Sequence, residues 1–440
     1  MTPPDAGSAA SLGQAMHGFV RELFPLCRSI TGDGLRQTLR MVADRIPLQL
    51  HEVASGTPVL DWVVPPEWHI RGARIETLAG APVVDFADCN LHVVSYSTPV
   101  DAVVSREELA AHVHTLPDQP DLVPYRTGYY AERWGFCLSH RVWESMRDPQ
   151  YRVRIDSTLA PGSLTYGELA ITGRESAEVL VSVHCCHPSL ANDNLSGIAV
   201  ATELARHLLL SDNRLSYRFL FIPATIGSLT WLAHHENVVP RIAHGLVLSC
   251  VGDAGPFHYK QSRRGDAAID RIVAHVLARR GQDHRILPFS PFGYDERQYC
   301  SPAYDLPVGC FMRSPNGTFP QYHTSADNPG FVTPAALEES LDVLVDVTRV
   351  LEHDRVFERV DGRGEPQLGR RGLYRAISGQ KDHAEAQMAL LWVLNQADGC
   401  HSLFDIAQRS GVGFDRLAAA AGLAEQAGLI RPVAAPPKKD

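Results

Sequence analysis

The chain has 440 residues, of which 45% are hydrophobic and 21% charged, and its net charge is −9. These values are typical of a folded protein with two or three domains and exclude a disordered or fibrous chain. The negative charge argues against a general affinity for nucleic acid or anionic membranes. Because no stretch approaches twenty apolar residues, we expect no membrane span.

The nine cysteines are scattered along the chain, and their number is odd. This distribution favours free thiols in a reducing compartment over a disulfide scaffold. The first residues also lack the basic segment and apolar run of a secretory signal. We therefore expect a cytoplasmic protein.

The first 150 residues change in character part-way along. Helical periodicity over 12–46, interrupted by Thr-Gly-Asp-Gly at 31–34, predicts two helices joined by a turn. From residue 58, short alternating segments are separated by turn residues, and a proline-rich loop follows at 114–130. We interpret 58–150 as a β-rich inserted domain.

The middle of the chain alternates strands and helices. Apolar runs at 177–183, 217–223 and 244–252 predict strands buried on both faces. Residues 194–210 have the apolar spacing of the helix that follows the first of these strands. We expect an α/β domain, made of 1–57 and 151–360, with its sites at the carboxyl ends of the strands.

The last part of the chain has a different pattern. A polar Gly/Arg stretch at 361–372 is typical of a linker, and three helical segments with a short strand predict a winged helix at 373–434. Winged helices can bind DNA, but residues 383–433 contain five acidic residues and three arginines. Because DNA binding needs cations that neutralise phosphates, we expect a packing or dimerisation module of a homo-oligomer and no nucleic-acid partner.

Residues 184–197, His-Cys-Cys-His-Pro-Ser-Leu-Ala-Asn-Asp-Asn-Leu-Ser-Gly, follow the first buried strand. His184 and Asp193 fall at the carboxyl edge of the predicted sheet, and imidazole and carboxylate groups are good zinc ligands. The alternative is that His184 and His187 are polar loop residues and that Asp193 caps the next helix. The adjacent cysteines have no second pair, which favours buried packing residues.

A second histidine segment, Tyr-His-Thr-Ser-Ala-Asp-Asn at 322–328, lies far downstream. Together, 179–197 and 322–328 resemble the zinc aminopeptidases with a co-catalytic two-metal site. In that family a strand ends in His-x-Asp, an Asn-Asp-Asn-x-Ser-Gly block follows, and a Tyr-His-Thr-x-x-Asp block comes later. The segment 295–309 is similar to the family's segment that ends in Gly-Ile-Pro.

A closer resemblance extends over nearly the whole chain. The segments 23–34, 90–100, 114–140, 250–265 and 292–309 are similar to a bacterial family of uncharacterised aminopeptidase-like proteins, often associated with polysaccharide biosynthesis. This resemblance implies a zinc-aminopeptidase-like mixed sheet flanked by helices, a β-rich inserted domain and a C-terminal winged helix.

The resemblance to zinc aminopeptidases implies that His184 is the first zinc ligand, Asp193 the bridging carboxylate and His323 the last ligand. Where that family has an aspartate that orients the first histidine, this chain has Cys186. His187 could compensate, either as a ligand or by contacting one. We also expect Asn192 and Asn194 to orient the aspartate between them.

Two further ligand positions depart from the family. The third ligand, an aspartate, is replaced by Ser249, and Asp253 four residues later is a candidate substitute. Ala224 and Thr225 stand where zinc aminopeptidases have two adjacent glutamates, a general base and a ligand. The closer family has Glu and then Thr at these positions, which implies one Zn²⁺ rather than two.

Position 224 decides whether the resemblance extends to catalysis. The general base takes a proton from the metal-activated water, and losing it lowers the rate roughly 10²- to 10⁴-fold. Glu296 and Asp295 are candidate replacements, and the alternative is that both form structural salt bridges with Arg297 or Arg264. Whether Ala224 is natural or introduced in place of a native glutamate stays open.

Several residues could select the substrate. Arg263, Arg264 and Arg313 could hold a carboxylate. Asp118, Tyr129 and Tyr130 from the insert could close over the site, although each type is more often an ordinary loop residue. Our hypothesis is a metal-dependent hydrolase that cleaves an amide bond in a small aminoacyl or peptidyl substrate. The alternative is a peptidase-fold protein that has lost catalysis and binds a ligand or assembles a complex.

Overall fold

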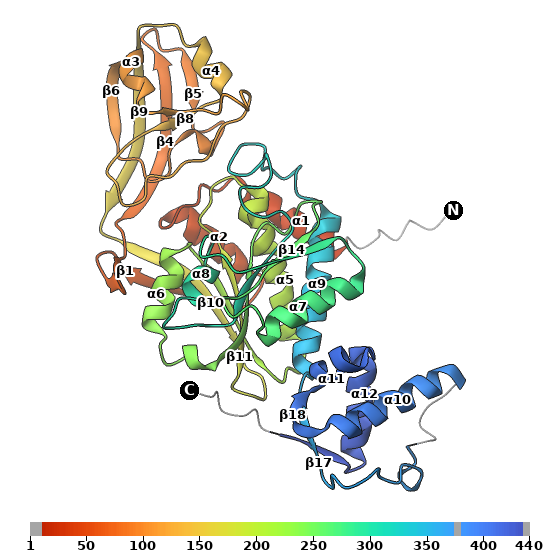
Figure 1. Cartoon of the computed structure of the whole chain (residues 1–440). Helices are drawn as coiled ribbons and strands as arrows, with labels where there is room; N and C mark the ends of the chain where they lie inside the picture. The colour runs from red at the N-terminus through yellow and green to blue at the C-terminus, as the bar shows by residue number, and fades with distance from the viewer. Residues whose placement is uncertain (1–10, 374–379, 434–440) are drawn as a thin grey trace, which may run out of the picture. The chain divides into compact units, whose positions relative to one another are not determined.

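The computed structural model describes residues 11–373 and 380–433. The chain forms two compact units, residues 1–345 and 346–440 (Figure 1). Among the described residues, no helix combines the length and the apolar character needed to cross a bilayer.

The first unit is built on an eight-stranded mixed sheet, in the order β1-β10-β12-β11-β13-β16-β14-β15. Its strands are β1 (Gln49–Ala54), β10 (Ser163–Ile171), β11 (Glu178–His184), β12 (Ser216–Ile222), β13 (Ile242–Leu248), β14 (Phe257–Lys260), β15 (His284–Leu287) and β16 (Val308–Met312). The four central strands, β12, β11, β13 and β16, run parallel, whereas β10 and β14 pair antiparallel with β12 and β16. The predicted buried strands are therefore confirmed, and every residue of β11 is buried.

Helices flank this sheet (Figure 1). They are α1 (Leu12–Leu23), α2 (Asp33–Ala43), α5 (Gly197–Leu209), α6 (Ile226–His234), α7 (Ala268–Arg280), α8 (Glu296–Tyr299) and α9 (Pro334–His353), with a 3₁₀ turn at Val239–Arg241. The predicted helix pair over 12–46 and the helix after β11 are both present. α5 buries its apolar stripe, including Ile198, Leu204 and Leu208, against the sheet and neighbouring helices.

The insert has an antiparallel sheet of its own, in the order β5-β4-β9-β6. The strands are β4 (Glu67–Thr77), β5 (Pro82–Asp85), β6 (Val100–Ser105) and β9 (Gln150–Ala160). β9 alternates buried and exposed residues from Gln150 onward, which is the pattern of a strand with one face covered. The sheet of the insert thus continues past residue 150.

Shorter elements complete the insert. They are β2 (Pro58–Val59), β3 (Trp62–Val63), the 3₁₀ turn Asn90–His92, α3 (Arg106–Ala110), β7 (Val113–His114), β8 (Phe136–Cys137) and α4 (His140–Ser145). The proline-rich loop predicted at 114–130 runs between β7 and β8. It reaches the α/β domain through an isolated bridge between Pro124 and Thr324, so the insert contributes directly to the surroundings of the second histidine segment.

In its described residues, the second unit contains the end of α9, three further helices and a three-stranded sheet, in the order β18-β17-β19. Its elements are β17 (Val356–Arg359), the 3₁₀ turn Gly369–Arg371, α10 (Gln380–Gln396), β18 (Asp398–Ser402), α11 (Leu403–Ser410), α12 (Phe414–Gln426) and β19 (Ile430–Pro432). The three helices and the last strand agree with the sequence pattern. β17 and β18 were not predicted, because both are short and border polar segments.

Candidate metal centre

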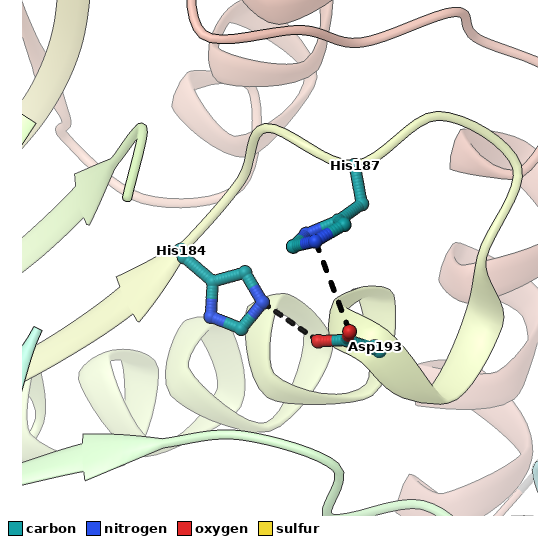
Figure 2. A group of neighbouring side chains, drawn as sticks. All are labelled: His184, His187 and Asp193. Carbon is teal, nitrogen blue, oxygen red and sulfur yellow. Dashed lines mark hydrogen bonds and ion pairs between the residues drawn. The ribbon is translucent and has the colours of Figure 1, made fainter. Parts of the chain in front are cut away.

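The carboxylate of Asp193 lies at the centre of a group of histidines. His184 is the last residue of β11, and Asp193 lies in the segment Ala191–Ser196 before α5, where its own backbone is not helical. His184 Nε2 is 2.8 Å from Asp193 Oδ1, and His187 Nε2 is 3.8 Å from Oδ2. Figure 2 shows both imidazole rings directed at this carboxylate, one from the strand end and one from the loop.

A third histidine, from a segment far along the chain, lies next to the same carboxylate. His323 Nε2 is 3.0 Å from Asp193 Oδ2. The two segments are held together by Asp327, whose carboxylate accepts hydrogen bonds from the backbone N–H groups of Asn192 (2.6 Å) and Asp193 (3.0 Å). The two histidine segments recognised in the sequence therefore meet at one point.

The ionisation of this group suits a divalent cation. Burial would raise the pKa of Asp193, but the adjacent His187 and the hydrogen bonds from His184 and His323 hold it well below its usual range. Burial lowers the pKa of His187 to about 3, against the opposing charge of Asp193. At neutral pH the group thus offers an ionised carboxylate and a neutral imidazole, which are the forms that bind zinc.

The donor atoms also have the spacing of a metal site. One donor atom each from His184, His187 and Asp193 lies within 4.8 Å of the other two. Nδ1 of His187 is buried without a hydrogen-bond partner among the described residues. The residues present therefore fit a zinc ion: imidazole and carboxylate donors, buried, and with one histidine nitrogen unused.

Asn194 helps to hold His184 in position. Its amide nitrogen lies 3.3 Å from His184 Nδ1 and donates to the Leu248 carbonyl (2.9 Å), while its oxygen accepts from the Cys250 N–H (3.2 Å). Asn194 thus contacts the histidine rather than Asp193. A Cβ on Gly197 would lie only 2.4 Å from this amide oxygen, which explains the glycine three residues later.

Two tyrosines complete the surroundings, and the sequence reasoning missed both. The Tyr294 hydroxyl lies 2.9 and 2.8 Å from the two oxygens of Asp193, and its ring stacks on His184 at 4.2 Å. Tyr322 stacks on His323 at 3.9 Å, and the two tyrosine hydroxyls are 2.9 Å apart. The only signal was position, because Tyr294 directly precedes the acidic pair at 295–296 and Tyr322 precedes His323.

Arg28 was also missed, and it shapes the loop that carries His187. Its buried guanidinium donates to the backbone carbonyls of Leu23 (2.6 Å), His187 (2.7 Å) and Pro188 (2.6 Å). Burial lowers the pKa of Arg28 to about 10, so it stays charged at neutral pH. The loop is therefore fixed by carbonyl contacts that no local sequence pattern reveals.

Asp253 is placed outside this group. Its carboxylate accepts hydrogen bonds from the Asn192 side chain (2.8 Å), the Gly255 N–H (2.7 Å) and the Ser314 hydroxyl (2.7 Å). Asn192 therefore contacts Asp253 rather than Asp193. These bonds occupy both oxygens of Asp253, which favours a structural role over ligation.

Glu296 and Asp295 are both buried but differ in their partners. Glu296 forms an ion pair with Lys260 and accepts from the Tyr294 N–H (3.1 Å). Glu296 thus has a structural salt bridge, but its partner is Lys260 and not Arg297 or Arg264, the partners anticipated from the sequence. Neither oxygen of Asp295 has a hydrogen-bond partner among the described residues. Burial raises the pKa of Asp295 to about 6, partly offset by nearby Ser228 and His184.

The three arginines proposed for substrate binding each pair with a carboxylate of the protein itself. Arg263 and Arg264 both pair with Asp305, at 2.9 and 3.1 Å. Arg313 is buried, pairs with Glu339 (2.9 Å) and donates to the Gly255 carbonyl (2.9 Å). Asp118 is exposed on the proline-rich loop. The structure therefore does not bring these arginines to the centre.

A cavity of about 370 Å³ adjoins the histidines. Its walls include Tyr129 and Tyr130 from the insert, as well as His187, His323 and Ala224. Ala224 lies two residues after the end of β12 and lines this cavity, so the position expected for the general base faces it with a methyl group in place of a carboxylate. The space is suited to a small substrate next to the metal donors.

Two parts of the chain match known protein families. Residues 17–354 match the model of a domain of unknown function, DUF4910. The chain belongs to this family. Residues 355–432 match a winged helix-turn-helix family, in agreement with the winged helix predicted from the sequence.

A relative from Clostridium acetobutylicum is 45% identical over 424 residues, covering 96% of this chain and 98% of its own. It is named as a polysaccharide biosynthesis protein with an aminopeptidase-like domain, a provisional name. A crystal structure of a provisionally named peptidase from the same organism has 44% identity and a TM-score of 0.89, and the match covers 96% of both chains. The family resemblance seen in the sequence is confirmed.

More distant structures share the fold. A zinc aminopeptidase from Bacillus subtilis has a TM-score of 0.56 at 14% identity, covering 76% of this chain and 93% of that one. A peptidase M28 precursor from Shewanella amazonensis has a TM-score of 0.55 at 13% identity, covering 78% and 93%. The α/β fold class, with an aminopeptidase-like mixed sheet, is thereby confirmed, and at these identities the likeness concerns the fold alone.

Proposed function

We propose that this protein is a zinc-dependent hydrolase of the aminopeptidase type, acting on an amide bond in a small aminoacyl or peptidyl substrate. The observation that carries the proposal is the buried Asp193 carboxylate, which His184, His187 and His323 approach at 2.8 to 3.8 Å. The peptidase-like fold and the aminopeptidase-like domain in the relative's name support it.

Zn²⁺ would be held by Asp193 and His323 with His184 or His187, and when bound it would polarise the substrate carbonyl and acidify a water molecule. The protein's own residues do the rest. Tyr294 holds the Asp193 carboxylate through its hydroxyl, and Asn194 holds His184. We propose one ion rather than two, because Thr225 and Ser249 occupy positions where the two-metal family has carboxylate ligands.

None of the described residues that line the cavity is a carboxylate that could accept the proton. Ala224 lines the cavity but cannot take a proton, and Glu296 is neutralised by Lys260. A second candidate function therefore has a specific observation in its favour: a protein that keeps the fold and the metal donors but binds a ligand without cleaving it. The residue at 224 distinguishes the two candidates.

Restoring a carboxylate at 224 tests the hydrolase. We expect Ala224→Glu to cleave aminoacyl p-nitroanilides roughly 10²- to 10⁴-fold faster than the parent chain, because a general base contributes about that much. Ala224→Gln is the matched control, similar in shape but unable to accept the proton. The hydrolase proposal fails if zinc-loaded, folded Ala224→Glu is no faster than Ala224→Gln on a panel of such substrates.

The biological setting is proposed from separate observations. The relative's name supports a place in a polysaccharide or natural-product pathway. All nine cysteines are free, which supports a cytoplasmic location. No membrane partner is proposed.

We propose that the winged helix serves packing or dimerisation. Within that unit Arg416 pairs with Glu385 (3.0 Å) and Arg431 with Glu358 (2.6 Å), so two of its cations are already engaged. The winged helix-turn-helix match itself is compatible with nucleic-acid binding. Salt-dependent binding of duplex DNA at low micromolar protein, measured by fluorescence anisotropy, would overturn the packing role.

A further inference from the structure

One arginine beside the candidate centre has no carboxylate partner, unlike Arg263, Arg264 and Arg313. Arg297 lies in the short helix α8 and lines the 370 Å³ cavity together with His187, His323 and Ala224. We infer that Arg297 binds a carboxylate of the substrate, so that the molecule taken into this cavity is an acid, namely an amide that carries its own free carboxylate. This inference rests on the proposed function for its description of the substrate as an amide.

The side chain of Arg297 is unpaired. Its Nε is buried without a hydrogen-bond partner, and its guanidinium forms no ion pair with any residue that the structure describes. A buried guanidinium N–H without an acceptor is unfavourable, so such groups are normally satisfied. Arg263, Arg264 and Arg313 illustrate the norm, since each pairs with a carboxylate of the protein itself.

The neighbouring acids do not neutralise Arg297. Glu296, the next residue along the chain, is directed to Lys260 instead. Asp295 is close enough for its pKa to be lowered by the charge of Arg297, yet no ion pair or hydrogen bond joins the two side chains. The positive charge at this wall of the cavity is therefore available to an anion that enters it.

The rest of the cavity favours the same kind of ligand. None of the described residues that line it is an aspartate or glutamate. Its wall is largely aromatic, formed by Trp62, Tyr125, Tyr129, Tyr130 and Tyr294. Such a wall offers stacking and apolar contact but no anionic partner for an ammonium group, whereas a guanidinium fork matches a carboxylate. Charge and shape thus point to an acid with an apolar or aromatic body.

The competing explanation is that Arg297 acts only inside the protein, as a distant counter-charge to buried Asp295. Both explanations predict some loss of stability when Arg297 is replaced. They differ in ligand choice, because only a carboxylate-binding role makes the protein distinguish an acid from the same molecule with its carboxylate capped.

The test uses that distinction on the full chain. N-acetyl-L-tyrosine and N-acetyl-L-tyrosinamide are titrated by calorimetry into the protein as purified, and again after chelation to separate binding by Arg297 from binding by a metal. We expect the acid to bind about tenfold or more tightly than the amide in both states, because a charge-assisted hydrogen bond contributes about that much. Arg297→Gln should lose this preference, and Arg297→Lys should keep part of it. Arg263→Gln, which removes an arginine paired with Asp305, should keep all of it.

The inference is overturned if the chelated parent chain binds the two probes equally or binds neither, or if folded Arg297→Gln keeps the preference. These outcomes are separate from the fate of the hydrolase. An active Ala224→Glu without acid preference would remove the inference and leave the proposed function. An Arg297-dependent preference with inactive Ala224→Glu would do the reverse, leaving a carboxylate-binding protein.

Discussion

Two groups of side chains among the described residues have the composition of a metal site, and they differ in what surrounds them. One is His184, His187 and Asp193, and the other joins Asp33, Glu67 and His69. In the second group the ring of His69 lies 3.0 Å from Asp33 and 2.7 Å from Glu67. By residue type and spacing alone, the second group is as good a candidate as the first.

The difference between the groups is a guanidinium. Arg36 contacts both carboxylates of the second group, Glu67 at 2.5 Å and Asp33 at 3.5 Å, and also Glu52 at 2.9 Å. Asp193 has no lysine or arginine within ion-pair distance among the described residues, and its partners are imidazoles and a tyrosine hydroxyl. A carboxylate whose charge is already neutralised is a poor cation ligand, so the comparison favours the Asp193 group.

Removing one carboxylate from each group tests this comparison, and here we expect the largest effect. Asp193→Asn should weaken zinc binding by more than about 100-fold, the upper range for loss of a residue that merely supports a ligand. Glu67→Gln should leave zinc affinity unchanged. Both affinities can be measured by competition with a chromogenic chelator, with circular dichroism to confirm folding. Equal losses in the two variants would show that the groups cannot be distinguished in this way.

The sequence predicted the first group well because its members lie in motifs. Strand β11 is an unbroken apolar run, so the position of His184 at its end followed from the pattern. His323 was joined to it only through the family resemblance, since 139 positions separate 184 from 323 and no local pattern links them. The contact depends on backbone hydrogen bonds to Asp327, which become visible only in the folded chain.

What the sequence could not supply is the pairing of charges. Arg263, Arg264 and Arg313 were reasonable candidates by type, but each has a carboxylate of the protein as its partner. Arg297 was considered only as a salt-bridge partner of its acidic neighbours, and the structure leaves it unpaired in the cavity wall. Ion pairs between segments far apart in sequence follow from tertiary packing, which a single sequence does not encode in any local pattern.

Asp295 is a third buried carboxylate, and it has neither the histidine partners of Asp193 nor the guanidinium partner of Glu67. Its folded-state pKa of about 6 lies above the ordinary value of 3.8, so the folded protein holds an extra proton between these values. Stability should therefore fall as the pH rises from about 4 to about 6, by up to about 3 kcal/mol for a shift of roughly two pKa units.

The variant Asp295→Asn removes this titration. We expect it to exceed the parent chain in stability at about pH 8 and to match it below about pH 4, as measured by urea unfolding in the presence of a chelator. Asp101→Asn is the control, because Asp101 is an exposed partner of Arg152 and should change stability little. If the difference in stability between the parent chain and Asp295→Asn does not change with pH, the pKa assigned to Asp295 is wrong.

Replacing Arg36 tests whether its guanidinium is what distinguishes the two groups. Arg36→Met keeps the apolar stem but leaves buried Glu67 without its cation, which should lower the free energy of unfolding by about 1–3 kcal/mol. The exposed ion pairs of Arg36 with Asp33 and Glu52 add little to this loss of stability.

If the guanidinium of Arg36 is what keeps zinc from the second group, Arg36→Met should also gain a second, weaker zinc equivalent at Asp33, Glu67 and His69. Arg36→Gln repeats the test with a neutral polar side chain, and the stoichiometry is measured by equilibrium dialysis and elemental analysis. Unchanged stoichiometry in both folded variants would mean that the geometry of the donors, and not the competing cation, makes Asp193 the better centre.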